Sequence, residues 1–412
     1  MARWAVRITT AFCLLTMAAA CLAEVDEVAL GKSKGYPAAP NWEQAGNDEF
    51  IVWTNSGGQE KFLPYQTIRA GEASPLRKSG EAPRISYEFQ GKSASLQDYL
   101  DRRRVTSLLI LKDGVIQHEH YQYGRNERHR FTSASMGKSV LGLLVGFAIE
   151  DGAIASVDDP AVRYLAALKG SVFEKLTIRN LLTMSTGLTW TEGGATGTHY
   201  RQMLDAMGKT GGLDVVLGFN HLQPRSAPGT SFFYSSLDSE LLGRVLAAAL
   251  RKSVSAYLEE KLWIPLGAEA DAVWFTDRAK VEMTHCCIGA ISRDFARLGA
   301  LLANKGSWNG RQILPARWLE EMTTLHGKHL EKVAIDREPR MGYGYQIWLM
   351  RENQIALRGN RGQVIFIDQK NKIVLVQTAV YGPSRNAMTN FAELDALWEG
   401  VLASLAGADK SR

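Results

Sequence analysis

Residues 131–145 read FTSASMGKSVLGLLV, and this stretch places Ser135 three positions before Lys138 at the start of an apolar run. Residues three apart on a helix share a face, so a serine in the first turn meets a lysine amine one turn later. A serine hydroxyl is a weak nucleophile that needs a base, and apolar surroundings lower the pKa of a lysine toward that role. The pattern predicts a Ser135 nucleophile activated by Lys138, although a lone Ser-x-x-Lys also arises by chance.

A second stretch, residues 228–236 (PGTSFFYSS), supplies Tyr234 just before a helix-like segment at 238–245. A tyrosine beside a cationic lysine has its phenolate favoured electrostatically. Tyr234 is therefore a candidate to take the proton of the serine and to return one to the leaving group.

A third stretch, residues 356–363 (ALRGNRGQ), precedes the apolar run 364–367 and has the composition of a glycine-rich strand edge. Glycines at such an edge let a substrate approach the backbone closely. An exposed main-chain N–H there can bind a developing oxyanion.

Taken in this order, the three stretches resemble the serine β-lactamase and penicillin-recognising superfamily, in particular the branch with class C β-lactamases, D-alanyl-D-alanine carboxypeptidases and related esterases. The likeness is closer to the 6-aminohexanoate-dimer hydrolase group, through the Tyr234 site, the Gly-x-x-Gly-Gln edge at 359–363 and the stretch 286–299. It covers the chain from about Ser86 onward. It implies an α/β (α+β) fold, with an antiparallel sheet of five or more strands flanked by helices and a mostly helical lobe.

The resemblance also implies roles for individual residues. Ser135 would be the acylated nucleophile, Lys138 and Tyr234 its proton-transfer partners, and the backbone N–H groups of Ser135 and Asn360 the oxyanion hole. The expected substrate-binding residues are Ser236, Arg358, Gly359 and Arg361. This chemistry needs neither a cofactor nor a metal.

Two departures from the superfamily pattern bear on the substrate. Leu357 begins the Leu-Arg-Gly that stands where β-lactamases have Lys-Thr-Gly, and Ser236 replaces the asparagine of the common Tyr-x-Asn. The lysine that helps to hold a substrate carboxylate is thus missing, unless Arg358 or Arg361 substitutes for it. The sequence favours an exported serine hydrolase that cleaves a small amide or ester through a Ser135 acyl-enzyme. The alternatives are a β-lactamase or D,D-carboxypeptidase, and a non-catalytic penicillin-recognising binding protein; the natural substrate and the oligomeric state stay open.

Composition sets broader limits. The chain has 412 residues, 45% of them hydrophobic, which is enough for a well-buried core. Its formal charge of +5 is too small and too dispersed to suggest a nucleic-acid partner.

Residues 1–23 form a predicted signal peptide, with Arg3 and Arg7 before an apolar stretch and small residues at its end. Cleavage after Ala23 would give a soluble periplasmic or secreted protein. Lipoprotein anchoring through Cys21 is the less favoured alternative. No later apolar stretch is long enough to span a bilayer.

The rest of the chain divides into an N-terminal extension, residues 24–80, and a main domain, residues 81–412, whose helical lobe covers about 155–285. The Asp-Gly at 113–114 predicts a hairpin between strands at 107–111 and 115–121. Helices are expected at 96–100, from Ser135 to 151 with a cap at Gly152, through 297–302 and near 391–405. Strands are expected at 50–53, 344–348, 364–368 and 373–379.

Several other residues have more than one interpretation. Adjacent cysteines bridge only with strain, so Cys286 and Cys287 are expected as two small buried side chains and not as a redox pair. His118 and His120 share a strand face without the partners of a metal site. Three residues in the loop-rich part of the helical lobe have two equally good interpretations, either lining the substrate cleft or ordinary packing: Trp190, His199 and Tyr200.

Overall fold

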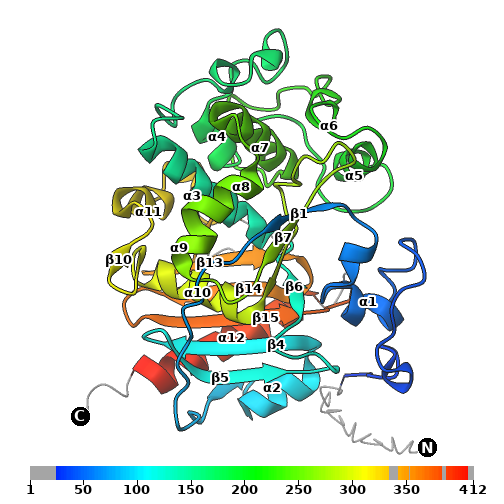
Figure 1. Cartoon of the computed structure of the whole chain (residues 1–412), viewed down its shortest axis with the longest axis vertical. Helices are drawn as coiled ribbons and strands as arrows, with labels where there is room; N and C mark the ends of the chain where they lie inside the picture. The colour runs from blue at the N-terminus through cyan, green and yellow to red at the C-terminus, as the bar shows by residue number, and fades with distance from the viewer. Residues whose placement is uncertain (1–24, 334–341, 352, 383–386, 407–412) are drawn as a thin grey trace, which may run out of the picture.

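The computed structural model describes residues 25–333, 342–351, 353–382 and 387–406. The predicted signal peptide, with Cys21, lies outside the described residues. Figure 1 shows two regions: a sheet with its flanking helices, which includes both ends of the described chain, and a mostly helical lobe above it.

A seven-stranded sheet forms the base of the molecule, and each of its neighbouring strand pairs is antiparallel. From edge to edge its strands are β11 (Gly342–Tyr343), β12 (Trp348–Leu349), β13 (Gln354–Gly359), β14 (Gln363–Asp368), β15 (Ile373–Ala379), β4 (Val105–Lys112) and β5 (Val115–Tyr121). Strands from the beginning and the end of the main domain therefore meet at the β15–β4 pair. The expected antiparallel sheet of five or more strands is confirmed.

Alternation along β4 shows how the sheet holds two layers of helices. Leu109 and Leu111 join the core that contains α10 (Ser292–Ala303), whereas Leu108 and Ile110 join the core that contains α12 (Ala387–Ala406). Side chains of successive strand residues point to opposite faces, so the apolar run 108–111 of this one strand serves both layers.

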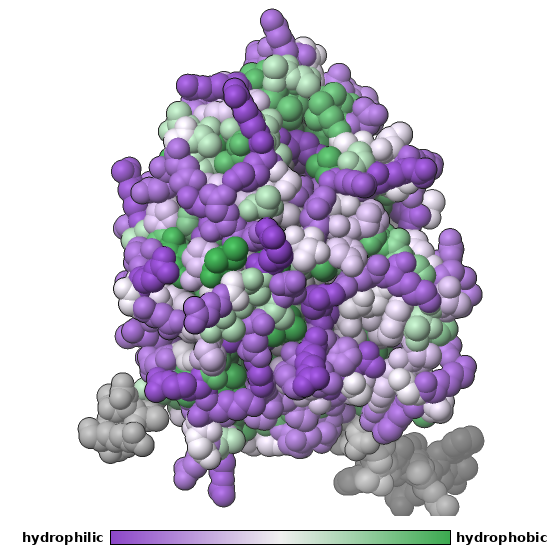
Figure 2. All heavy atoms as spheres, viewed as in Figure 1, coloured by the Kyte–Doolittle hydropathy of each residue, from purple (hydrophilic) through white to green (hydrophobic). Residues whose placement is uncertain are grey.

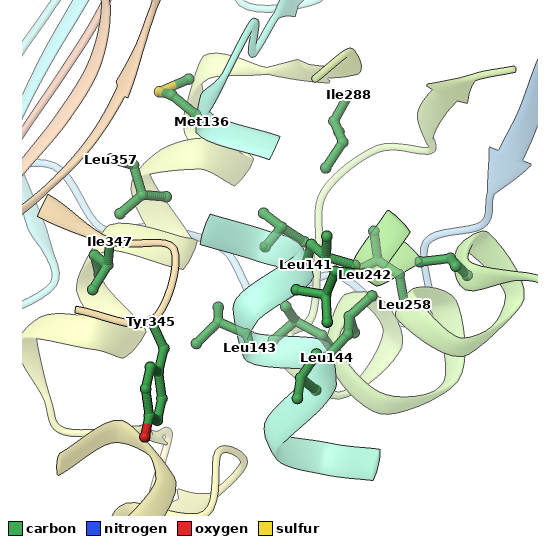
Figure 3. Close-up of a cluster of buried hydrophobic side chains, with 14 of the residues drawn as sticks. Met136, Leu141, Leu143, Leu144, Leu242, Leu258, Ile288, Tyr345, Ile347 and Leu357 are labelled. Atoms are coloured by element: carbon green, nitrogen blue, oxygen red, sulfur yellow. The ribbon is translucent and has the colours of Figure 1, made fainter. Parts of the chain in front are cut away.

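The helix that follows Ser135, α3 (Met136–Glu150), lies between the sheet and the helical lobe. The other helices of this lobe are α4 (Ile178–Leu182), α5 (His199–Lys209), α6 (Asp214–Leu217), α7 (Ser236–Leu250), α8 (Val254–Leu258) and α9 (Ile264–Leu266). Figure 3 shows Leu141 and Leu144 of α3 beside Leu242 of α7 and Leu258 of α8. The first thirteen residues of α3, 136–148, are buried, because it is surrounded by protein on all sides.

A smaller four-stranded sheet adjoins the start of α3. Its order is β1 (Tyr65–Ile68), β7 (Ala272–Phe275), β8 (Ile288–Ile291) and β6 (Arg130–Thr132), all antiparallel. The N-terminal segment thus contributes an edge strand to this sheet. Besides short helical turns, the remaining α-helices and strands of the described residues are α1 (Asp48–Thr54), α2 (Leu96–Arg102), α11 (Ala316–Met322), the hairpin β2 (Ser86–Phe89) and β3 (Lys92–Ser95), and the hairpin β9 (Ser307–Trp308) and β10 (Arg311–Gln312).

Most local expectations hold, and two are wrong. The β4–β5 turn has positive φ at Asp113 and Gly114, as an Asp-Gly hairpin requires. The expected strand at 50–53 lies instead in α1, because a short apolar run next to acidic residues also suits a helix start. The expected strand at 344–348 is mostly a bend, with Gln346 at φ 58°, and only its last residue enters β12.

The face of the molecule drawn in Figure 2 is mostly hydrophilic, and hydrophobic residues appear on it in small groups. Over the described parts of the chain, no helix combines the length and the apolar character that crossing a membrane requires.

Candidate active site

Ser135 lies at the N-terminus of α3, directly after a tight turn. The turn is held to β8 by a 2.7 Å hydrogen bond from the Ser133 N–H to the Ile288 carbonyl, and Ala134 adopts φ 44°. A positive φ at a residue other than glycine is strained and persists where the surroundings enforce it. The result is a Ser135 side chain that is partly exposed at the positive end of a long helix.

Lys138 is 1% exposed and its amine has three oxygen partners. It donates to the His285 carbonyl at 2.6 Å, to Ser135 Oγ at 3.3 Å and to Ser236 Oγ at 3.3 Å. The structure therefore brings together Ser135 and Lys138 as the sequence predicts, and adds the His285 carbonyl as the shortest contact.

Burial lowers the pKa of Lys138 to about 8, against the opposing effect of the Glu192 and Glu240 carboxylates. Removal from water disfavours the ammonium form, and α3 with its neighbours provides the apolar surroundings. An amine with this pKa is available as a base near neutral to mildly alkaline pH.

Tyr234 also reaches this site, but not as the expected phenolate. The Lys138 amine lies 5.0 Å from the centre of the Tyr234 ring, and the ring also stacks on Trp348 with 5.8 Å between the ring centres. Burial raises the pKa of Tyr234 above its ordinary value, and a hydrogen bond with Ser135 only partly opposes this. The resting side chain is a neutral phenol, which can donate a proton.

The glycine-rich edge approaches the nucleophile turn as predicted. β12 pairs with Ile355 and Ala356 only, so the rest of β13 extends beyond it toward Ser135. A Cβ on Gly359 would lie 2.5 Å from the Ser133 carbonyl oxygen, a distance that no side chain tolerates. The main chain entering Asn360 consequently passes close to the turn before Ser135.

The two arginines of this edge are occupied elsewhere. Arg358 lies over the Phe391 ring of α12 at 4.4 Å, and Arg361 donates to the Tyr381 carbonyl at 3.2 Å. The structure shows neither guanidinium in place of the missing lysine. Ser236 is buried, and its hydroxyl bonds within the site to Lys138 and Glu192, so it is not on an open wall where substrate would lie.

Sequence reasoning missed two groups of the site, Glu192 and the main chain of His285. The Glu192 carboxylate accepts from Ser236 Oγ at 2.6 Å, from the Ser236 N–H at 2.9 Å and from Trp190 Nε1 at 2.6 Å. Glu192 stands in a glycine-rich loop with no periodic pattern, and a carbonyl has no sequence signature. Trp190 is 4% exposed and packs against Phe219, which favours its packing role over a cleft.

Cys286 and Cys287 differ from expectation, since their sulfur atoms are joined in a disulfide. The ligand atoms of His285 and these cysteines lie within 4.8 Å of one another. However, His285 Nδ1 faces Glu240 at 2.6 Å, and the sulfurs are bonded to each other. This group therefore does not offer a free set of metal ligands.

Fold and site together define a serine hydrolase, in which the Ser135 hydroxyl is paired with a buried lysine. A family model described as Beta-lactamase matches residues 94–395, and the chain belongs to the β-lactamase family. It is related to the 6-aminohexanoate-dimer hydrolase of Paenarthrobacter ureafaciens, with 22% identity over 360 residues, which cover 84% of this chain and 89% of the relative.

Solved structures show the same fold. A Bacillus anthracis protein provisionally assigned as a 6-aminohexanoate-dimer hydrolase superposes with a TM-score of 0.77 at 23% identity, over 88% of this chain and 98% of the other. EstCE1, described as a hydrolase with promiscuous acyltransferase activity, gives a TM-score of 0.60 at 17% identity, over 74% and 96% of the two chains.

Proposed function

We propose that this chain is an exported hydrolase that cleaves a small amide or ester through an acyl-enzyme on Ser135. The observation that carries the proposal is the 3.3 Å contact between Ser135 Oγ and the amine of a buried Lys138 whose pKa is about 8. A positioned base of this kind is what a serine hydroxyl needs to attack a carbonyl carbon.

Acylation would proceed in two proton transfers. Neutral Lys138 takes the hydroxyl proton as Ser135 Oγ bonds to the carbonyl carbon, which gives a tetrahedral intermediate. Tyr234, a neutral phenol, then donates its proton to the departing nitrogen or oxygen, and Lys138 reprotonates the tyrosine. Water enters by the reverse sequence and releases the acid.

The intermediate carries a negative oxygen that must be stabilised. The N–H groups of Ser135 and Asn360 are the proposed donors, since the end of β13 passes against the turn before Ser135. The N-terminus of α3 adds a favourable field at the same place. Donors fixed before the reaction stabilise such a charge strongly.

The proposed substrate class follows from the absence of the carboxylate-binding lysine that β-lactamases have. Leu357 stands where a lysine would hold a carboxylate, and Arg358 and Arg361 contact Phe391 and Tyr381 instead. A small linear amide or ester, as suggested by the name of the Paenarthrobacter relative, suits this site better than a penicillin. β-Lactamase or D,D-carboxypeptidase activity remains the alternative within the family.

The test compares initial rates of the purified protein and its Ser135→Ala variant on three substrates: a linear aminohexanoate dimer, a short-chain nitrophenyl ester and a chromogenic cephalosporin. We expect turnover of the amide or the ester that depends on Ser135, with little turnover of the cephalosporin. Dominant cephalosporin turnover would favour the β-lactamase alternative, and full activity of the serine variant would refute the mechanism.

Export has its own test. The proposal rests on the leader pattern of residues 1–23 alone. N-terminal sequencing of the protein recovered from a bacterial periplasm is expected to begin at Glu24. A lipid-modified Cys21 would establish anchoring instead, and an intact Met1 in the cytoplasm would contradict export.

A further inference from the structure

The loop between α4 and α5 places the Glu192 carboxylate inside the site. Glu192 Oε2 receives two N–H donors, from Trp190 and from the Ser236 main chain, and Oε1 receives the Ser236 hydroxyl at 2.6 Å. The loop itself is anchored by Trp190, which stacks on His199 at 5.6 Å, and by hydrogen bonds between Thr191 and His199. Glu192 is thus held firmly with both oxygens engaged.

These contacts fix the direction of the Ser236 hydroxyl. Its hydrogen points to Glu192, so its oxygen can only accept from Lys138. The protonated Lys138 amine then has three donors for three acceptors, namely the His285 carbonyl, Ser236 Oγ and Ser135 Oγ.

When Lys138 is neutral, it keeps two N–H donors and gains one lone pair. The His285 carbonyl has no hydrogen, and the Ser236 hydrogen is committed to Glu192. Ser135 also shares a hydrogen bond with Tyr234, in which the neutral phenol can be the donor. Among the three groups that Lys138 contacts, Ser135 alone then has a hydrogen left to donate. The lone pair must therefore face Ser135, which is the geometry that proton abstraction requires.

We propose that Glu192 is a positioning residue, which holds the Ser236 hydroxyl hydrogen away from Lys138 and so directs the base toward Ser135. The inference rests on the proposed function of Ser135 and Lys138. It adds a residue that touches neither substrate nor nucleophile and that acts through Ser236.

The charge of Glu192 acts on the same amine. Together with Glu240 it raises the pKa of Lys138 against the effect of burial. The titratable groups around Glu192 and Lys138 are Tyr200 on α5, Tyr234 before α7, Asp238 and Glu240 on α7, and His285 before β8. Removal of the Glu192 charge should therefore shift the titration of Lys138 to lower pH.

The Glu192→Gln variant changes the direction of the Ser236 hydroxyl and removes the charge near Lys138, but it keeps a side chain of the same size to anchor the loop. Two N–H donors face the Oε2 position, so the glutamine oxygen must take that place and its NH₂ must face Ser236 Oγ. The NH₂ then donates to Ser236, whose released hydrogen turns toward the lone pair of Lys138. In this variant Ser236 competes with Ser135 for the base.

The readout is the rate at which a fluorophosphonate probe labels Ser135, measured from pH 6 to 9.5. It reports activation of the nucleophile without knowledge of the natural substrate. We expect Glu192→Gln to slow labelling at least ~10-fold at pH 8 and to move the midpoint of the pH profile downward. Ser236→Ala removes the competing hydroxyl, so adding Glu192→Gln to it should change the rate less than about threefold.

The controls distinguish the possible failures. Glu150→Gln removes an exposed carboxylate from the far end of α3 and should leave the profile unchanged. Equal losses from Glu192→Gln in both backgrounds, or an unchanged midpoint, would reduce Glu192 to a structural residue and overturn the proposal. If Glu192→Gln does not fold, Glu192→Asp, which keeps the charge but withdraws the carboxylate from the Ser236 hydroxyl, should slow labelling several-fold in the wild-type background and much less in the Ser236→Ala background; equal losses in the two backgrounds would overturn the proposal. Absence of labelling in the wild-type protein would instead refute the function of Ser135.

Discussion

The amine of Lys138 donates a 2.6 Å hydrogen bond to the main-chain carbonyl of His285, 147 residues further along the chain. His285 is itself fixed, because its N–H and Nδ1 both bond to Glu240 Oε1 at 2.9 and 2.6 Å. Arg244 holds the second oxygen of that carboxylate at 2.5 Å. The Lys138 amine is therefore positioned by a buried ionic network.

The first prediction concerns pH. Only neutral Lys138 can accept the serine proton, and its pKa is about 8. The value of kcat/KM should rise with pH and reach half of its plateau near pH 8, because protonation below that pH removes the base. Lys138→Met should lose at least ~100-fold at the plateau. A flat profile between pH 6.5 and 9.5 would exclude Lys138 as the base.

Tyr234→Phe should discriminate between leaving groups. The ring would keep its stack on Trp348, so the midpoint of thermal unfolding should hardly change. Without the phenol, an amide nitrogen leaves unprotonated, and amide turnover should fall ~100-fold or more. Nitrophenolate needs no proton to leave, so ester turnover should fall much less. Equal losses on the two substrates would argue against proton donation by Tyr234.

Gly359→Ala and Asn360→Ala test the close approach of β13. A Cβ at position 359 would meet the Ser133 carbonyl at 2.5 Å and Ala134 Cβ at 3.0 Å, which forces the nucleophile turn to move. We expect kcat to fall by at least ~10-fold for Gly359→Ala, since displaced reacting groups are costly. Asn360→Ala keeps its N–H and should stay within about threefold. The reverse order of effects would place the oxyanion donor in the Asn360 side chain.

Gly146→Ala should destabilise the fold even though alanine favours a helix. A Cβ there would lie 2.0 Å from Trp318, whose Nε1 donates to the Gly142 carbonyl at 3.0 Å. Overpacking of this kind costs about 1–3 kcal/mol of the free energy of unfolding. Gly208→Ala in α5 has nothing within 4 Å and is the matched control, expected to be neutral or slightly stabilising. Denaturant unfolding of both variants gives the comparison.

The features that could be predicted from sequence are those that depend on residues close together in the chain. The Ser135 and Lys138 pair follows from helical spacing, the β4–β5 hairpin from its Asp-Gly turn, and β15 from an apolar run with no competing interpretation. The glycine-rich edge was placed correctly because close approach requires glycine.

The features that were missed depend on contacts between distant segments. Glu192 and Ser236 are 44 residues apart, and no sequence motif near either residue indicates that they form a hydrogen bond. The expectation of a phenolate at Tyr234 does not hold, because burial raises the pKa of Tyr234, the Glu192 charge adds to the rise, and the hydrogen bond with Ser135 only partly opposes it. The run at 50–53 suited either a helix or a strand, and tertiary packing selected the helix.

The pairing of β4 with β15 has a consequence for how the enzyme becomes active. Thr106 and Thr378 join their hydroxyls across this pair at 2.8 Å, although 272 residues separate them. Contacts so distant form slowly during folding. The nucleophile turn also needs β8 and the end of β13, both made late in synthesis. A partly synthesised chain would therefore contain Ser135 and Lys138 without an assembled site. During refolding, the rate at which activity returns should equal the rate at which the slowest of these long-range contacts forms.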